Sequence, residues 1–133
     1  LSKETDKDLV IRFFELHMLE YAGFKPQLFR CLACDEEILP RDQYFSAREG
    51  GALCPKCGSR SEEALPISMR ALKAMRHFQR SSYIEAKRLR LSTEVNREVE
   101  MLMQHYLTYL LERSLNTPPF LRRLRRSSHE PQV

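Results

Sequence analysis

The stretch CLACDEEILPRDQYFSAREGGALCPKCG, residues 31–58, contains all four cysteines of this 133-residue chain. They form two CxxC pairs separated by nineteen residues, in the pattern C-x2-C-x19-C-x2-C. A CxxC turn places both sulfurs on one side of a tight loop. A hairpin between two such turns brings the four thiolates together as a tetrahedral site. The spacing therefore predicts one metal ion bound by Cys31, Cys34, Cys54 and Cys57.

The predicted ligand set also indicates which metal binds and what it does. Soft thiolates in tetrahedral geometry select zinc ahead of an iron–sulfur or single-iron centre. Four protein ligands leave no open position on the ion, so its role is expected to be structural rather than catalytic. Zinc binding contributes roughly 10–16 kcal/mol in zinc-finger peptides. That exceeds what the core of such a short loop can supply. The expected cofactor is one structural Zn²⁺.

The segment between the cysteine pairs predicts a β-hairpin. Gln43–Ala47 favours a short strand and Ala52-Leu53 its return, with the turn at Glu49-Gly50-Gly51. Gly58, directly after the last cysteine, predicts a left-handed backbone that directs N–H groups toward sulfur. The corresponding residue of the first pair is Asp35, which tolerates that conformation better than most residues.

The segment before the ribbon predicts a helix. Thr5 or Asp6 can cap it, and Gly23 ends it. Apolar residues recur at helical spacing in two adjoining stripes. The first stripe is Leu9, Phe13, Leu16 and Leu19, and the second is Val10, Phe14, Met18 and Tyr21. An apolar surface this wide predicts that the helix is covered on more than one side.

Two further helices are predicted after a linker at residues 58–66. One extends from a Ser68 cap to about Gln79, and the other from a Ser92 cap to Pro118-Pro119, while residues 81–91 are ambiguous. The expected inward positions are Leu72, Met75 and Phe78, then Val95, Val99, Leu102, Tyr106 and Leu110. The predicted fold is thus mainly α with minor β. A helical domain comprises residues 1–28 and 60–126, a zinc ribbon is inserted at 29–59, and a disordered tail covers 127–133.

Charge is unevenly distributed along the chain. Residues 1–66 carry 9 Lys and Arg against 12 Asp and Glu, whereas residues 67–133 carry 13 against 6. Two basic patches stand out in the second half: the helical stripe Arg70, Lys73, Arg76 and Arg80, and the group Lys87, Arg88 and Arg90. Such a stripe can bind phosphate, accept an acidic peptide whose apolar end enters a neighbouring pocket, or remain solvated. Both patches are candidate partner- or DNA-binding residues, with Leu72 and Met75 as the neighbouring apolar positions.

Several functional classes are disfavoured by the sequence. No apolar run approaches the roughly 18–20 residues of a membrane span, and no signal-peptide pattern is present. Clustered CxxC pairs indicate a reducing compartment, so a cytoplasmic location is expected. The four histidines lack catalytic partners, and no phosphate-binding glycine loop or small-molecule site is evident. A dithiol oxidoreductase needs a CxxC at a helix start in a βαβ context, which neither pair has.

The order of these features resembles the C-terminal region of the RecO family of bacterial DNA repair and recombination mediators. The resemblance rests on FFELHMLEYAGFKPQLFRCLAC, YFSAREGGALCPKC and the long helix introduced by LRLS, and spans about residues 10–125. The matching positions include Phe14-Glu15-Leu16, Gly23, Pro26, Leu28, Phe45-Ser46, Gly50-Gly51 and the four cysteines. Asp35 departs from the usual glycine.

The resemblance implies a non-catalytic role in the RecF pathway of DNA repair, in single-strand annealing and RecA loading. The implied partners are RecR, the C-terminal tail of single-stranded DNA-binding protein, and single- and double-stranded DNA. DNA contact is expected mainly through an N-terminal OB-fold that this chain lacks, and nucleoid association is expected during repair. The alternative is an independent zinc-ribbon nucleic-acid-binding module. Acidic residues near the cysteines (Asp35, Glu36, Glu37, Asp42 and Glu49) disfavour direct DNA reading by the ribbon.

Overall fold

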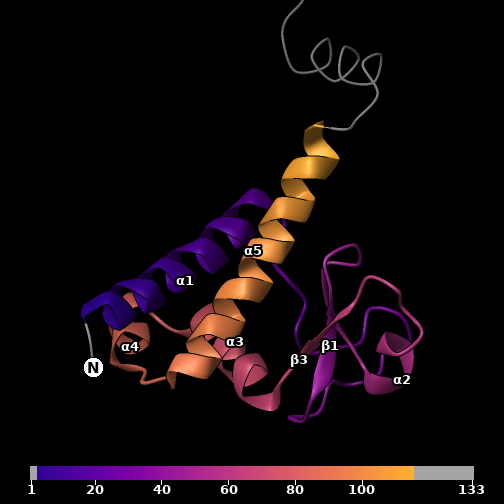
Figure 1. The fold of residues 1–133 in the computed structure, drawn as a ribbon, viewed down its shortest axis with the longest axis horizontal. Coiled ribbons are helices and arrows are strands. Elements are labelled where there is room, and N and C mark those ends of the chain that lie inside the picture. The colour runs from indigo at the N-terminus through magenta and orange to yellow at the C-terminus, as the bar shows by residue number, and fades with distance from the viewer. Residues whose placement is uncertain (1–2, 116–133) are drawn as a thin grey trace, which may run out of the picture.

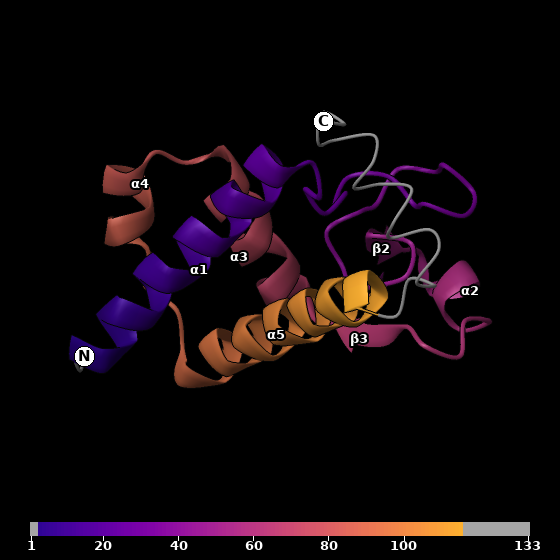
Figure 2. The same ribbon diagram turned by 90° about the horizontal axis from the view of Figure 1, so that it is seen from above.

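The computed structural model describes residues 3–115 and has two parts, a group of helices and a small sheet, with a long helix between them (Figure 1). The helices are α1 (Lys3–Ala22), α3 (Met69–Arg80), α4 (Tyr83–Arg88) and α5 (Thr93–Leu115). Seen from above, α5 extends from the helical group until its C-terminal end lies over the sheet (Figure 2). The mainly α fold with minor β is confirmed. The predicted stop at Pro118-Pro119 and the tail at 127–133 lie outside the described residues.

Helix α1 ends as its glycine predicts. Gly23 has φ +90°, its N–H donates to the carbonyl of Glu20 at 3.1 Å, and the Phe24 N–H donates to Leu19 at 2.7 Å. This pattern is a Schellman motif, which needs the left-handed backbone that glycine adopts at low cost. The start differs, because the helix begins at Lys3, before the expected caps.

One of the two apolar stripes of α1 is covered and the other is not. Leu9, Phe13, Leu16 and Leu19 are buried, and α1 packs on α3, α4 and α5. In the second stripe Phe14, Met18 and Tyr21 are 54%, 63% and 94% exposed. The expected covering of this second stripe is therefore wrong for the part of the chain that the structure describes.

The other predicted helices form with their expected caps. Ser68 Oγ accepts the Ala71 N–H at 3.1 Å to begin α3, and Ser92 Oγ accepts the Val95 N–H at 3.2 Å at the start of α5. All the predicted inward residues of α3 and α5 are buried except Leu110, which is half-buried. The ambiguous stretch 81–91 contains α4, which begins with a capping box between Ser82 and Glu85.

The sheet has three antiparallel strands in the order β2-β1-β3. The hairpin strands β1 (Gln43–Ser46) and β2 (Gly51–Leu53) lie where the sequence predicts them, with Phe45 opposite Ala52. The third strand, β3 (Leu65–Ile67), pairs Phe45 with Leu65 inside the segment predicted as linker and helical domain. The sheet thus extends further along the chain than predicted. Proline at position 66 is compatible with β3 because it is an edge strand.

The sheet and the helices share one hydrophobic core. Phe45 of the central strand is fully buried and contacts Tyr106 of α5 edge to face, with ring centroids 5.6 Å apart. The Tyr106 hydroxyl donates to the Phe24 carbonyl at 2.8 Å, which connects α5 to the segment between α1 and the ribbon. These contacts hold the ribbon in a defined position beside the helices.

Candidate functional site

The four cysteines converge at the end of the ribbon away from the helices. Their Sγ atoms all lie within 4.8 Å of one another, and those of Cys34 and Cys54 are 3.9 Å apart. Tetrahedral zinc with Zn–S bonds of about 2.3 Å would separate its sulfurs by roughly 3.8 Å. The spacing therefore fits a metal ion held by four thiolates and is consistent with zinc.

Two different local structures position the sulfurs. The first pair lies on a turn that Asp35 completes with φ 63°, as predicted, and the Asp35 N–H donates to the Cys31 carbonyl at 2.8 Å. The second pair lies at the start of α2 (Pro55–Gly58), a single helical turn. There the Cys57 N–H donates to the Cys54 sulfur at 3.4 Å, a backbone hydrogen bond that orients this sulfur at the start of the turn.

Gly58 is required for a different reason than predicted. It lies in the last turn of α2, and Asp35, Gly23 and Gly50 are the only described residues with positive φ. A Cβ on Gly58 would lie 2.3 Å from carbons of the Tyr44 ring. The predicted left-handed backbone at Gly58 is therefore wrong, and the close approach of strand β1 is what excludes a side chain.

The thiols do not ionise equally. Burial raises the pKa of Cys31, but the N–H groups of Cys54, Cys34 and Ala33 outweigh it and lower that pKa to about 6. Hydrogen bonding to Cys54 and burial raise the pKa of Cys57 to about 12. One thiolate is thus favoured in the metal-free cluster, and a divalent cation would stabilise the others by removing their mutual repulsion.

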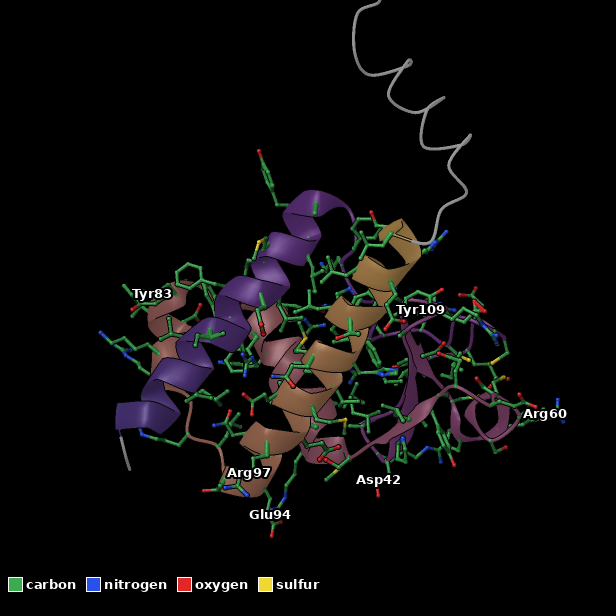
Figure 3. The ribbon with its side chains drawn as sticks, turned by 45° about the horizontal axis from the view of Figure 1, so that its top comes forward. Asp42, Arg60, Tyr83, Glu94, Arg97 and Tyr109 are labelled. Atoms are coloured by element: carbon green, nitrogen blue, oxygen red, sulfur yellow. The ribbon has the colours of Figure 1, made fainter. Side chains whose placement is uncertain are left out.

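Three cations lie beside the cysteine cluster. A hollow of about 400 Å³ beside it is lined by Arg41, Lys56 and Arg60 together with Glu36, and Arg60 projects at this end of the molecule (Figure 3). A four-thiolate centre with a divalent ion carries two net negative charges, so these cations offset its charge. The surroundings of the site are less acidic than the local sequence indicates.

Arg76 of α3 contacts the ribbon rather than solvent. Its guanidinium donates to the Leu28 carbonyl at 2.8 Å and to the Ile38 carbonyl at 2.7 Å, and its carbon Cζ lies 4.6 Å from the centre of the Phe29 ring. Leu28 and Ile38 lie on the two sides of the first cysteine pair. Arg76 therefore connects α3 to both segments that lead into that pair.

Two neighbours of Arg76 make similar contacts. The Arg80 guanidinium stacks over the same Phe29 ring, 4.2 Å from its centre. The Gln79 amide donates to the Pro26 carbonyl at 2.8 Å. The face of α3 formed by Arg76, Gln79 and Arg80 is therefore the attachment site of the ribbon.

The remaining cations of the stripe border a hollow that we call the basic pocket. It has a volume of about 460 Å³ and lies between α3 and the start of α5. Its lining residues are Arg70, Lys73, Ala74, His77, Leu89, Arg90, Leu91, Ser92 and Val95. The structure thus brings Arg70 and Lys73 together with Arg90, and places Arg76 and Arg80 elsewhere.

Other residues of the predicted site lie outside this pocket. Leu72 and Met75 are fully buried, so they cannot contact a partner, and Leu89, Leu91 and Val95 supply the apolar surface instead. Lys87 and Arg88 are exposed on α4, where the Lys87 ammonium lies 5.9 Å from the centre of the Tyr83 ring. Sequence periodicity did not indicate Leu89 and Leu91, because they precede α5 in a segment without regular structure.

Comparison with known proteins identifies the family. The family described as "Recombination protein O C terminal" matches residues 1–119. A "DNA repair protein RecO" of Roseiflexus sp. (strain RS-1) is 39% identical over 86% of this chain and 40% of its own length. Proteins of the same name from Dehalococcoides mccartyi and Symbiobacterium thermophilum are each 33% identical, over 44% and 49% of their own lengths. No solved structure gives a significant match.

Fold, cysteine cluster and sequence agree on the class: a mainly helical fold with a small three-stranded sheet and four cysteines close enough together to hold a metal ion. The chain belongs to the RecO C-terminal family. It spans less than half the length of the three relatives named above. Across residues 3–115, no helix is sufficiently long and apolar to span a membrane.

Proposed function

We propose that this chain is the C-terminal part of a RecO-type recombination mediator, acting in DNA repair without catalysing a reaction. Membership of the family and the names of its relatives support the repair role. The family resemblance extends the proposal to the RecF pathway, to annealing and RecA loading with RecR and single-stranded DNA-binding protein, and to the cytoplasm and nucleoid. The four cysteines hold one structural Zn²⁺ in this proposal, supported by their sulfur spacing.

The observation that carries the proposal is the chemistry of the basic pocket. Its apolar surface comes from Ala74, Leu89, Leu91 and Val95, and its cations are Arg70, Lys73 and Arg90. It also lies at the first turn of α5, where the helix dipole favours negative charge. This combination suits a peptide that has acidic residues and an apolar end, as expected for the tail of single-stranded DNA-binding protein.

A peptide titration tests this placement. A fluorescent peptide with acidic residues and a C-terminal phenylalanine is titrated with the wild-type chain and with the double variant Arg70→Glu/Lys73→Glu. We expect the double variant to bind at least about tenfold more weakly, because two attractive charges become repulsive. Lys87→Glu is the matched control, since Lys87 is an exposed cation outside the pocket. Equal affinity of the double variant and the control would contradict the placement.

The alternative of an independent nucleic-acid-binding ribbon is favoured by one observation, the cations Arg41, Lys56 and Arg60 beside the cysteines. Tight, salt-sensitive binding of DNA that Arg41→Glu/Arg60→Glu abolishes, with no response to the acidic peptide, would support that alternative. Metal analysis separates both from a dithiol oxidoreductase. One zinc per chain and no reducible dithiol would exclude the redox function.

A further inference from the structure

A second hollow, which we call the aromatic groove, lies at the other end of α5. It has a volume of about 280 Å³ and is bordered by the C-terminal half of α5, the segment after α1 and the β1–β2 turn. Tyr109 lies on the side of α5 that faces the ribbon (Figure 3). Helix α5 has 23 residues, so its two ends are about 34 Å apart. Within the described part of the chain, the aromatic groove and the basic pocket share no lining residue.

The walls of the groove are aromatic and apolar. Phe24 is 49% exposed and Leu32 is 38% exposed, while Tyr109 is half-buried and completes the apolar lining. The Tyr106 hydroxyl is also at the groove but is engaged with the Phe24 carbonyl, which fixes the backbone beneath the Phe24 ring. An exposed phenylalanine held in place this way presents a flat surface on which a planar group can stack.

Cations outnumber anions at the groove. Among residues 3–115, the lining cations are Lys25, Arg48 and Arg113, and Glu49 is the single lining carboxylate. Lys25 is 3.5 Å from Glu20 of α1, so part of its charge is offset. The Arg48 side chain is exposed and lies on the turn between β1 and β2, where it can reach a phosphate without displacing a packed side chain.

We propose that the aromatic groove binds single-stranded DNA, stacking a base against Phe24 and Tyr109 while Arg48 and Lys25 contact the phosphate backbone. Sequence-independent binding of single strands combines these two elements, aromatic surfaces and a basic path for the phosphates. The competition with duplex DNA described below decides between an unpaired strand and a duplex as the ligand. The proposal rests on the DNA-repair role proposed above, but not on the peptide pocket.

The groove differs from the basic pocket in a way that favours a nucleic acid over a peptide. The apolar surface of the basic pocket is aliphatic, whereas the groove is lined by the aromatic residues Phe24, Tyr106 and Tyr109. Aliphatic surfaces accept side chains of any shape, while exposed aromatic faces favour planar bases. A peptide ligand for the groove is therefore an outcome of the test and not the proposal.

Fluorescence anisotropy with a labelled oligothymidylate tests the proposal on the whole chain. Oligothymidylate forms no duplex, so its signal reports single-strand binding. We expect Phe24→Ala to weaken binding about tenfold through lost stacking. Arg48→Glu should also weaken binding about tenfold. It should reduce the slope of log affinity against log salt concentration by about one, as expected for the loss of one phosphate contact. The matched controls are Phe14→Ala, an exposed aromatic on α1, and Arg97→Glu, an exposed cation on the N-terminal half of α5 that lines neither hollow. Neither should change oligothymidylate affinity by more than about twofold.

Each outcome of these titrations either supports or overturns the assignment of the aromatic groove to single-stranded DNA. Circular dichroism first establishes that every variant is folded, and Tyr109→Leu replaces Phe24→Ala if the latter fails to fold. Loss confined to the groove variants, with duplex DNA failing to compete, supports the proposal. No binding of oligothymidylate by the wild-type chain overturns it, as does equal loss in groove and control variants. If Arg48→Glu lowers affinity for the acidic peptide alone, the groove is a peptide site. The peptide result with Arg70→Glu/Lys73→Glu stands independently, so failure of one proposal is distinguishable from failure of the other.

Discussion

The two faces of helix α3 carry similar residues in different environments. On one face the donors of Arg76 and Gln79 are satisfied by backbone carbonyls of the segments that lead into the ribbon. On the other, Arg70 and Lys73 border an open pocket with an aliphatic surface. A cation whose donors are bonded inside the molecule contributes to stability, whereas one at the edge of a pocket is available to a partner. The four predictions below test this division, in order of expected effect.

Removing one metal ligand should have the largest effect, and only on the ribbon side of α3. We expect Cys54→Ser to lose its metal and unfold the ribbon, because an ion held by three thiolates loses much of the free energy that orders the loop. Metal analysis of the purified variant and far-ultraviolet circular dichroism measure the two consequences. A Cys54→Ser protein that keeps its metal and its fold would refute the structural role of the site.

Lower pH should weaken metal binding at the ribbon. Hydrogen bonding to Cys54, followed by burial, raises the pKa of Cys57 to about 12, so that thiol is protonated at neutral pH when no metal is bound. The ion must displace this proton, and its affinity therefore rises with pH and falls as pH falls. The expected change is about tenfold per pH unit for each proton released.

Competition against a chromophoric chelator across the neutral range measures this dependence. The control is the affinity of the chelator itself for zinc over the same pH range, which corrects for protonation of the chelator. A metal affinity that does not change with pH would show that the thiols are already ionised in the metal-free protein.

Arg76 and Arg70 provide a matched pair for the two faces of α3. Replacing Arg76 with methionine removes the donors to the carbonyls of Leu28 and Ile38, and we expect it to destabilise the metal-loaded protein by about 2–3 kcal/mol. Arg70→Met removes an exposed cation at the pocket edge and should change stability by less than about 0.5 kcal/mol. Urea unfolding measures both. Equal values would mean that the Arg76 contacts add nothing to the attachment of the ribbon.

A methyl group at Gly58 should have the smallest of these effects. The added Cβ would lie 2.3 Å from the Tyr44 ring, so the ring or α2 must shift. We expect Gly58→Ala to cost about 1–2 kcal/mol, and the double variant Gly58→Ala/Tyr44→Ala to lose less than the sum of the two single variants. Thermal unfolding compares them. Additive losses would show that the two residues do not contact each other.

Local signals predicted much of the fold. Serine caps, a terminal glycine and a 3.6-residue apolar period located α3, α5 and the end of α1, because capping and periodicity act within a few residues. The capping box at Ser82 and Glu85 was an available signal for α4. Strand β3 had no such signal, since Leu65-Pro66-Ile67 is too short to show alternation. It is a strand only because β1 lies beside it.

The cysteine cluster and the basic stripe show where sequence reasoning ends. Cysteine spacing by itself predicted that the four sulfurs converge, since each CxxC turn constrains its own two sulfurs and one hairpin joins the turns, and they lie within 4.8 Å of one another. Helical spacing placed four cations on one stripe, but that stripe spans about 120° of the helix between Arg70 and Arg76. Only the tertiary structure decided that Arg76 donates to two backbone carbonyls. It also decided that Arg70 and Lys73 border the open basic pocket, whose apolar lining includes Leu89, Leu91 and Val95. The neighbours that a helix face meets come from distant segments, and the sequence of the helix does not contain them.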